Sequence, residues 1–134
     1  MSSLLAISSS ASEVADHALR AVQKLLVELD GAGAVVIAST DGFELAHGGR
    51  LAIDPARLAA MVSSFAALGE VASRESGIGT PRCLVIDSSD GRLVVRCMQL
   101  RGQSIVVVVL TDASMLLGRV WHSLAAAERL MGDA

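Results

Sequence analysis

The most reactive side chains in this sequence, three histidines and two cysteines, are scattered along the chain. His17, His47 and His122 fall in three different predicted elements, and no two of them have the spacing of metal ligands. Cys83 and Cys97 do not form a Cys-x-x-Cys pair. The sequence therefore predicts no zinc site, and we expect the histidines to be surface or partly buried residues.

Other catalytic patterns are also missing from the sequence. Serine is abundant, but no Gly-x-Ser-x-Gly turn follows a predicted strand. Asp87 and Asp90 resemble an acid and base pair, yet their position around a hairpin tip is better explained by turn formation. The glycine-rich segments 30–33 and 76–81 precede strands, whereas phosphate-binding loops follow a strand and open a helix. We expect a protein that is not an enzyme and needs no cofactor.

The two cysteines leave a geometric question open, because they lie on neighbouring strands of one predicted hairpin. A two-residue tip at Asp90 and Gly91 directs the thiols to opposite faces of the sheet, whereas a three-residue tip places them opposite each other, close enough to oxidise. A thiol-dependent enzyme would need a nearby cation to lower the thiol pKa. Arg82 and Arg96 adjoin the cysteines in sequence, but neighbours on a strand point to opposite faces. We expect inert thiols.

The elements that position these residues alternate between helices and strands. Hydrophobic periodicity predicts helices at about 12–29, 55–75 and 113–131, and strands at 34–39, 43–48, 82–88, 92–100 and 104–110. Asp54 and Pro55 are an N-cap and first-turn pair for the second helix. Two hairpins favour an α/β fold with a five-stranded, mainly antiparallel sheet in the order 2-1-5-4-3. Helices one and three are expected on one face and helix two on the other, with residues 1–11 as a flexible tail and 12–134 as one domain.

Composition excludes several classes of protein. The chain is 52% hydrophobic and 19% charged, which argues against disorder. Its net charge of −3 and its three aromatic residues argue against nucleic-acid binding. Its apolar runs are shorter than the roughly 20 residues that span a bilayer, so we expect no membrane insertion. The N-terminus lacks the layout of a signal peptide, and we expect a cytoplasmic protein.

The second predicted helix has an unusual surface, because twelve consecutive residues from Leu58 to Gly69 carry no charge. A helix that packs one side against a sheet normally presents a charged face to water on its other side. One stripe is assigned to the sheet: Leu58, Met61, Val62, Phe65 and Ala72, with Leu68 at its edge. The other is assigned to a second copy of the chain, together with the apolar edge strand 82–88. The predicted dimer interface comprises Ala60, Ser63, Ser64, Ala67, Val71, Leu84 and Ile86.

These segments, in this order, resemble the roadblock/dynein light chain family. The matching motifs are the Asp41-Gly42 hairpin, the small-residue helix at 57–76 and the Gly91 hairpin, and the resemblance covers about 15–130. It implies a profilin-like fold, and homodimers or heterodimers joined through the second helix and third strand. Arg92 departs from the pattern, because many members have an aromatic residue after the Gly91 turn.

The resemblance also implies a function: a non-catalytic module that binds and regulates, or scaffolds, a Ras-like small GTPase. In bacteria such domains often partner a GTPase resembling the gliding-motility polarity switch. Some members activate hydrolysis by reshaping the GTPase, so neither Arg50 nor Arg101 is assigned as an arginine finger. The alternative is a ligand-sensing domain of related architecture, with Arg96, His47 and His122 as candidate polar groups in a pocket.

Overall fold

The computed structural model describes the backbone of residues 2–132 and the side chains of residues 12–131. Within this range, helices and strands alternate as the sequence predicts. The elements are α1 (Ser2–Glu28), β1 (Ala32–Ser39), β2 (Glu44–Gly49), α2 (Pro55–Glu75), β3 (Leu84–Ser88), β4 (Gly91–Leu100), β5 (Gln103–Asp112) and α3 (Leu117–Gly132). No described helix is both long enough and apolar enough to cross a membrane.

The five strands form one antiparallel sheet in the order β2-β1-β5-β4-β3, which confirms the predicted order. The central strand β5 and its neighbour β1 are the most buried strands. Every residue of β1 is buried, and so are residues 105–109 of β5. An unbroken apolar run is typical of a strand that is covered on both faces.

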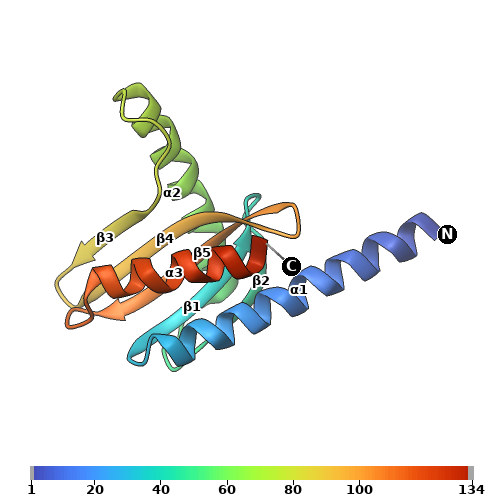
Figure 1. Cartoon of the computed structure of the whole chain (residues 1–134), viewed down its shortest axis with the longest axis horizontal. Coiled ribbons are helices and arrows are strands. Elements are labelled where there is room, and N and C mark those ends of the chain that lie inside the picture. The colour runs from blue at the N-terminus through green and yellow to red at the C-terminus, as the bar shows by residue number, and fades with distance from the viewer. Residues whose placement is uncertain (1, 133–134) are drawn as a thin grey trace.

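Helices cover both faces of this sheet (Figure 1). On one face, α1 and α3 pack through side chains such as Val22, Leu25 and Leu124 against alternate residues of the strands. On the other face, α2 packs through Ala59 and Val62. The two sides of each central strand therefore belong to different layers of the core, as we expected from the connections.

Two helix boundaries differ from the sequence prediction. α1 begins at Ser2 instead of near Ser12, so the predicted tail has a helical backbone from residue 2 onward. Extending an existing helix adds a hydrogen bond without a new nucleation cost, so the helix can continue through this serine-rich segment. α3 begins at Leu117 instead of near Ala113, because the Asp112 carboxylate accepts hydrogen bonds from the Ser114 and Met115 backbone and holds a turn there.

The second helix begins as predicted but extends beyond the sheet. Asp54 caps it by accepting a hydrogen bond from the Arg57 backbone nitrogen at 3.2 Å, and Pro55 occupies the first turn. Figure 1 shows the C-terminal end of α2 and the following loop projecting away from the sheet. We call residues 70–81 the α2 arm. Most of its residues are exposed, and Ser73 is the one that is fully buried.

Candidate interaction surface

The side of α2 that faces the sheet differs from the predicted stripe. The prediction was correct for Val62 and for the half-buried Leu58 and Phe65, but wrong for Met61 and Ala72, which are exposed. Sequence analysis missed Ala59 and Ala66, which pack on the sheet in their place. These small side chains let the helix axis approach the strands closely, which turns larger apolar side chains outward.

The outward side of α2 is consequently apolar and exposed. Four of the five α2 residues assigned to the dimer interface are exposed: Ala60, Ser64, Ala67 and Val71. Their spacing of four, three and four residues places them on one side of the helix. Met61 (54% exposed) and Leu68 (69%) lie beside them. Because apolar surface is costly to hydrate, this face is a candidate contact surface.

Ser63 is the exception among the predicted interface residues. Its side chain is buried, and its Oγ lies 2.8 Å from the Ala59 carbonyl oxygen and 3.2 Å from the Ser39 carbonyl oxygen of β1. It therefore belongs to the packing of α2 on its own sheet. We remove it from the proposed interface.

The edge strand β3 continues the exposed surface of α2. Within residues 2–132 it pairs with β4 alone, so no described strand pairs with the backbone groups along its other side. Leu84 packs with the α2-side core, and Ile86 is 44% exposed. A β-carbon built on Gly69 of α2 would lie 2.6 Å from the terminal carbons of Leu84, so helix and strand touch here. α2 and β3 therefore form one contiguous apolar surface.

The histidines are not brought together. His17 on α1 contacts the Arg101 guanidinium, and His47 on β2 lies 2.5 Å from the Glu44 carboxylate. His122 is exposed on α3. Among the described residues, no three histidine, cysteine or acidic side chains are grouped so that they could hold a metal ion.

The register of the β3–β4 hairpin places the two cysteines on different faces. Ser88 pairs with Gly91 and Leu84 with Val95, so the tip is Ser89 and Asp90, one residue earlier than the two-residue tip predicted. Cys83 packs with the α1 and α3 side of the core, whereas Cys97 follows Val95 on the α2 side. Both thiols are free.

The surroundings of both thiols oppose nucleophilic chemistry. Loss of solvent around the sulfur raises the pKa of the half-buried Cys83, although a hydrogen bond with the Arg96 guanidinium partly offsets the effect. The same cause raises the pKa of Cys97, a residue that is exposed overall. Arg96 of β4 is thus a cross-strand neighbour of Cys83. The sequence shows Arg96 only as the chain neighbour of Cys97, so sequence reasoning missed this contact. Because the nucleophile is the thiolate, a raised pKa does not support the thiol-enzyme hypothesis.

The fold and the motifs can now be compared with known proteins. The Roadblock/LC7 domain family matches residues 19–111. The chain belongs to this family. A comparison with proteins of curated function returned no match.

Solved structures similar to this chain include three of proteins named MglB. Myxococcus xanthus MglB is 17% identical, with a TM-score of 0.70 over 92% of this chain and 88% of that one. The gliding protein MglB from Thermus thermophilus is 24% identical, with a TM-score of 0.71 over 90% of this chain and 93% of that one. An MglB described as having a tetrameric arrangement is also 24% identical, with a TM-score of 0.73 over 90% of this chain and 88% of that one. These likenesses show that the architecture is the profilin-like roadblock fold.

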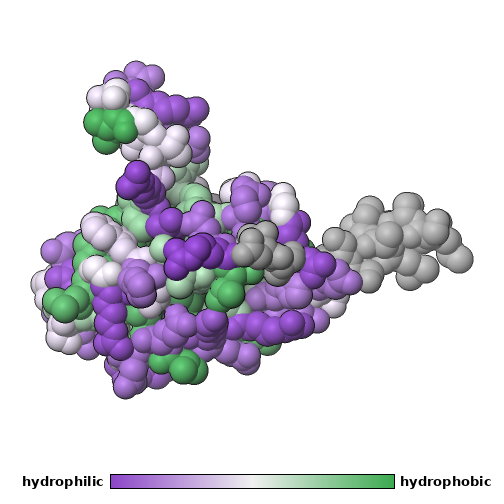
Figure 2. Space-filling model, viewed as in Figure 1, coloured by the Kyte–Doolittle hydropathy of each residue, from purple (hydrophilic) through white to green (hydrophobic). Residues whose placement is uncertain are grey.

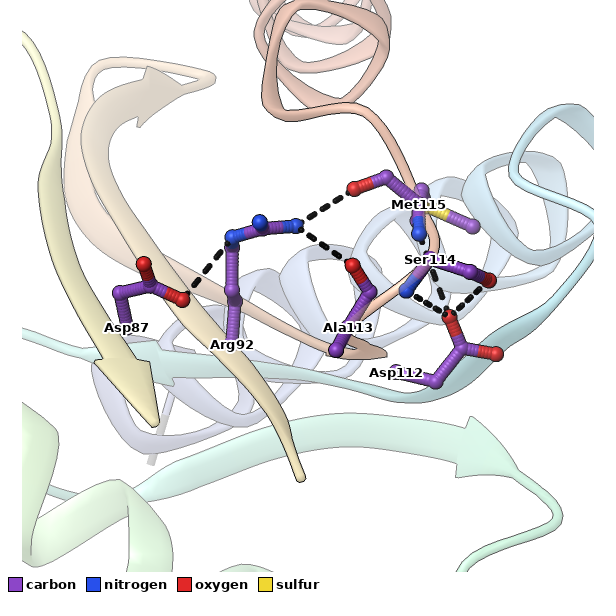
Figure 3. Close-up of polar contacts among 6 residues, drawn as sticks. All are labelled: Asp87, Arg92, Asp112, Ala113, Ser114 and Met115. Atoms are coloured by element: carbon purple, nitrogen blue, oxygen red, sulfur yellow. Dashed lines mark hydrogen bonds and ion pairs between the residues drawn. The ribbon is translucent and has the colours of Figure 1, made fainter. Parts of the chain in front are cut away.

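Arg92, the departure from the roadblock pattern, has a structural role here. Its Nε lies 3.2 Å from the Asp87 carboxylate of β3, and its Nη1 donates to the carbonyl oxygens of Met115 (2.7 Å) and Ala113 (3.4 Å) (Figure 3). Asp112 caps the same turn. Arg92 therefore connects the β3–β4 hairpin to the loop that leads into α3.

Proposed function

We propose that this roadblock chain forms a homodimer through α2 and β3, and that the dimer binds and regulates a Ras-like small GTPase without catalytic chemistry of its own. The observation that supports it best is the contiguous apolar surface of α2 and β3. The family also supports the GTPase partner, because the resemblance to roadblock proteins implies binding to Ras-like small GTPases. Such a partner is cytoplasmic, and we propose the same compartment for the chain.

The physical case for self-association rests on exposed apolar side chains and an open edge. Met61, Leu68 and Val71 are each about half exposed or more. Full burial of one such side chain contributes roughly 1.5–3 kcal/mol. The small residues Ala60, Ser64 and Ala67 permit two helices to approach closely. A two-fold axis that sets α2 against its copy also brings the two β3 edges together, which would join both sheets.

The experiment begins with affinity capture from the native host, with the tagged chain as bait. Any small GTPase recovered is then purified separately, and its GTP turnover is measured with and without the chain. We expect direct binding, a changed rate of turnover or nucleotide exchange, and no GTP hydrolysis by the chain alone. Robust turnover by the chain alone contradicts the non-catalytic role. Failure of every purified host GTPase to bind contradicts the assigned partner.

A further inference from the structure

An open groove of about 790 Å³ lies where the α2 arm meets β3 and α3. Its walls come from three separate segments: the arm and the residues that follow it, with Ile78 and Arg82; β4, with Arg96; and α3, with Trp121 and His122. In Figure 2 the arm stands apart from the body of the molecule, with hydrophobic and hydrophilic side chains mixed where the two meet. The volume falls within the roughly 300–1,000 Å³ typical of small-molecule sites.

Three side chains of this groove, Arg82, Arg96 and His122, are basic, and Ser73 and Thr80 add hydroxyl groups. Arg82 is exposed at the rim, and Arg96 and His122 line the wall. Among the described residues, no aspartate or glutamate lines the groove, although the chain as a whole has a net charge of −3. Because Arg96 is paired with Glu128, the positive charge that favours an anion comes mainly from Arg82.

Arg96 is held in place by the fold. Its Nε and Nη2 donate to Oε2 of Glu128 on α3, at 2.8 and 2.5 Å, and its guanidinium also contacts the Cys83 thiol. Glu128 offsets part of the charge of Arg96, so the exposed Arg82 is the stronger cation for a ligand. A guanidinium that is already oriented loses little conformational freedom when it binds.

The apolar wall includes the only tryptophan of the chain, Trp121, which is 46% exposed. Ile78 is also exposed, and Pro81 is half-buried. An indole face next to guanidinium groups suits a planar ring that carries a negative charge, because the ring packs on the indole while the anion reaches the cations.

We propose that this groove binds a small anionic ligand with a planar apolar body, held by Arg82, Arg96 and His122 and packed against Trp121. The concave shape and the basic side chains that line it favour a small molecule over a protein segment. None of the proposed dimer-interface residues lines the groove, so the site is independent of the GTPase-regulating role. The site unites Arg96 and His122, two of the three candidates for a ligand-sensing pocket, and excludes His47.

The test uses 8-anilinonaphthalene-1-sulfonate, an anionic aromatic dye, with the full-length protein. Since Trp121 is the only tryptophan, its fluorescence reports on this groove alone. We expect saturable quenching of Trp121 and dye emission that rises with the same binding curve. The neutral dye N-phenyl-1-naphthylamine, which has the same ring system without the sulfonate, should bind more weakly.

Two matched variants locate the dye. Arg82→Gln should weaken binding of the sulfonate dye about tenfold and leave the neutral dye unchanged, because it removes one exposed cation. Arg57→Gln removes an exposed cation on the first turn of α2, outside the groove, and should change neither dye.

Three outcomes overturn the proposal. The first is dye binding that does not quench Trp121, which places the dye on the exposed face of α2. The second is equal loss of affinity in Arg82→Gln and Arg57→Gln. The third is Trp121 quenching only in a monomeric variant, which would assign the groove to contacts between protein chains.

Discussion

At the scale of single residues, Ser63 fixes how α2 sits on the sheet. Its hydroxyl is close to two carbonyl oxygens, one in its own helix and one in β1, and its side chain is buried at 8% exposure. A serine hydroxyl has one proton, so it donates to one of the two or is shared between them. Ser64, the next residue, faces outward, and its contact with the Ala60 carbonyl is longer, at 3.4 Å.

We predict that Ser63→Ala lowers the free energy of unfolding by about 1 kcal/mol, because it removes a buried hydrogen bond. The Ser39 carbonyl keeps its bond from the Gly42 backbone nitrogen, which limits the loss. Ser64→Ala is the matched control and should change stability by less than about 0.5 kcal/mol. Urea denaturation at one fixed protein concentration measures both. A dimer that dissociates in Ser63→Ala without any loss of protomer stability would return Ser63 to the interface.

At the scale of elements, Arg92 couples the edge hairpin to the last helix. Its side chain, which is 24% exposed, links β4 to the loop between β5 and α3 (Figure 3). The Met115 carbonyl that it binds belongs to the loop before α3. Gly91, the preceding residue, is required for a different reason: a β-carbon there would lie 2.2 Å from the Thr111 carbonyl oxygen of β5.

Arg92→Ala should lower the free energy of unfolding by about 1–2 kcal/mol, since a hydrogen bond from a charged donor to a backbone carbonyl is lost. Asp87→Asn removes the ion pair alone. Because the Asp87 side chain is 69% exposed, this control should cost less than about 0.5 kcal/mol. Thermal unfolding by circular dichroism compares the two variants. Equal losses would mean that the ion pair, and not the link to the α3 loop, is the important contact.

At the scale of the whole molecule, the sheet has two differently covered faces. The proposed dimer surface lies on the α2 face and the β3 edge, whereas α1 and α3 cover the opposite face. The groove at the arm lies beside α3 and shares no residue with the proposed interface. Dimerisation through α2 would therefore leave α1 free to contact another protein.

We predict that Ala67→Glu converts the dimer to a monomer, because it buries an unpaired carboxylate between two apolar helices. Ala67 is exposed in the single chain, so the protomer should stay folded. Light scattering at micromolar concentration measures the mass. The control variant Gln23→Glu adds the same charge at an exposed position of α1, and this variant should remain dimeric. An unchanged dimer in Ala67→Glu would show that another surface joins the chains.

Local signals in the sequence were sufficient to predict the order of the strands and the start of α2. Two hairpins and one helical crossover leave few ways to arrange five strands, and the predicted order is the observed one. Asp54 and Pro55 act within one turn of the chain, so their effect is readable without tertiary contacts. The apolar run of β5 indicated its central position in the same way.

The rotation of α2 and the composition of the groove were decided only by the tertiary structure. Periodicity shows that α2 has two apolar stripes, but both fit a helix equally well, and the close approach of Ala59 and Ala66 to the sheet selects between them. Arg82 and Trp121 are distant in sequence and line one groove because the α2 arm returns to the sheet edge beside α3. Helix and strand patterns arise from the local spacing of apolar residues. Which side of a helix is buried depends on the shape of the sheet surface on which the helix packs.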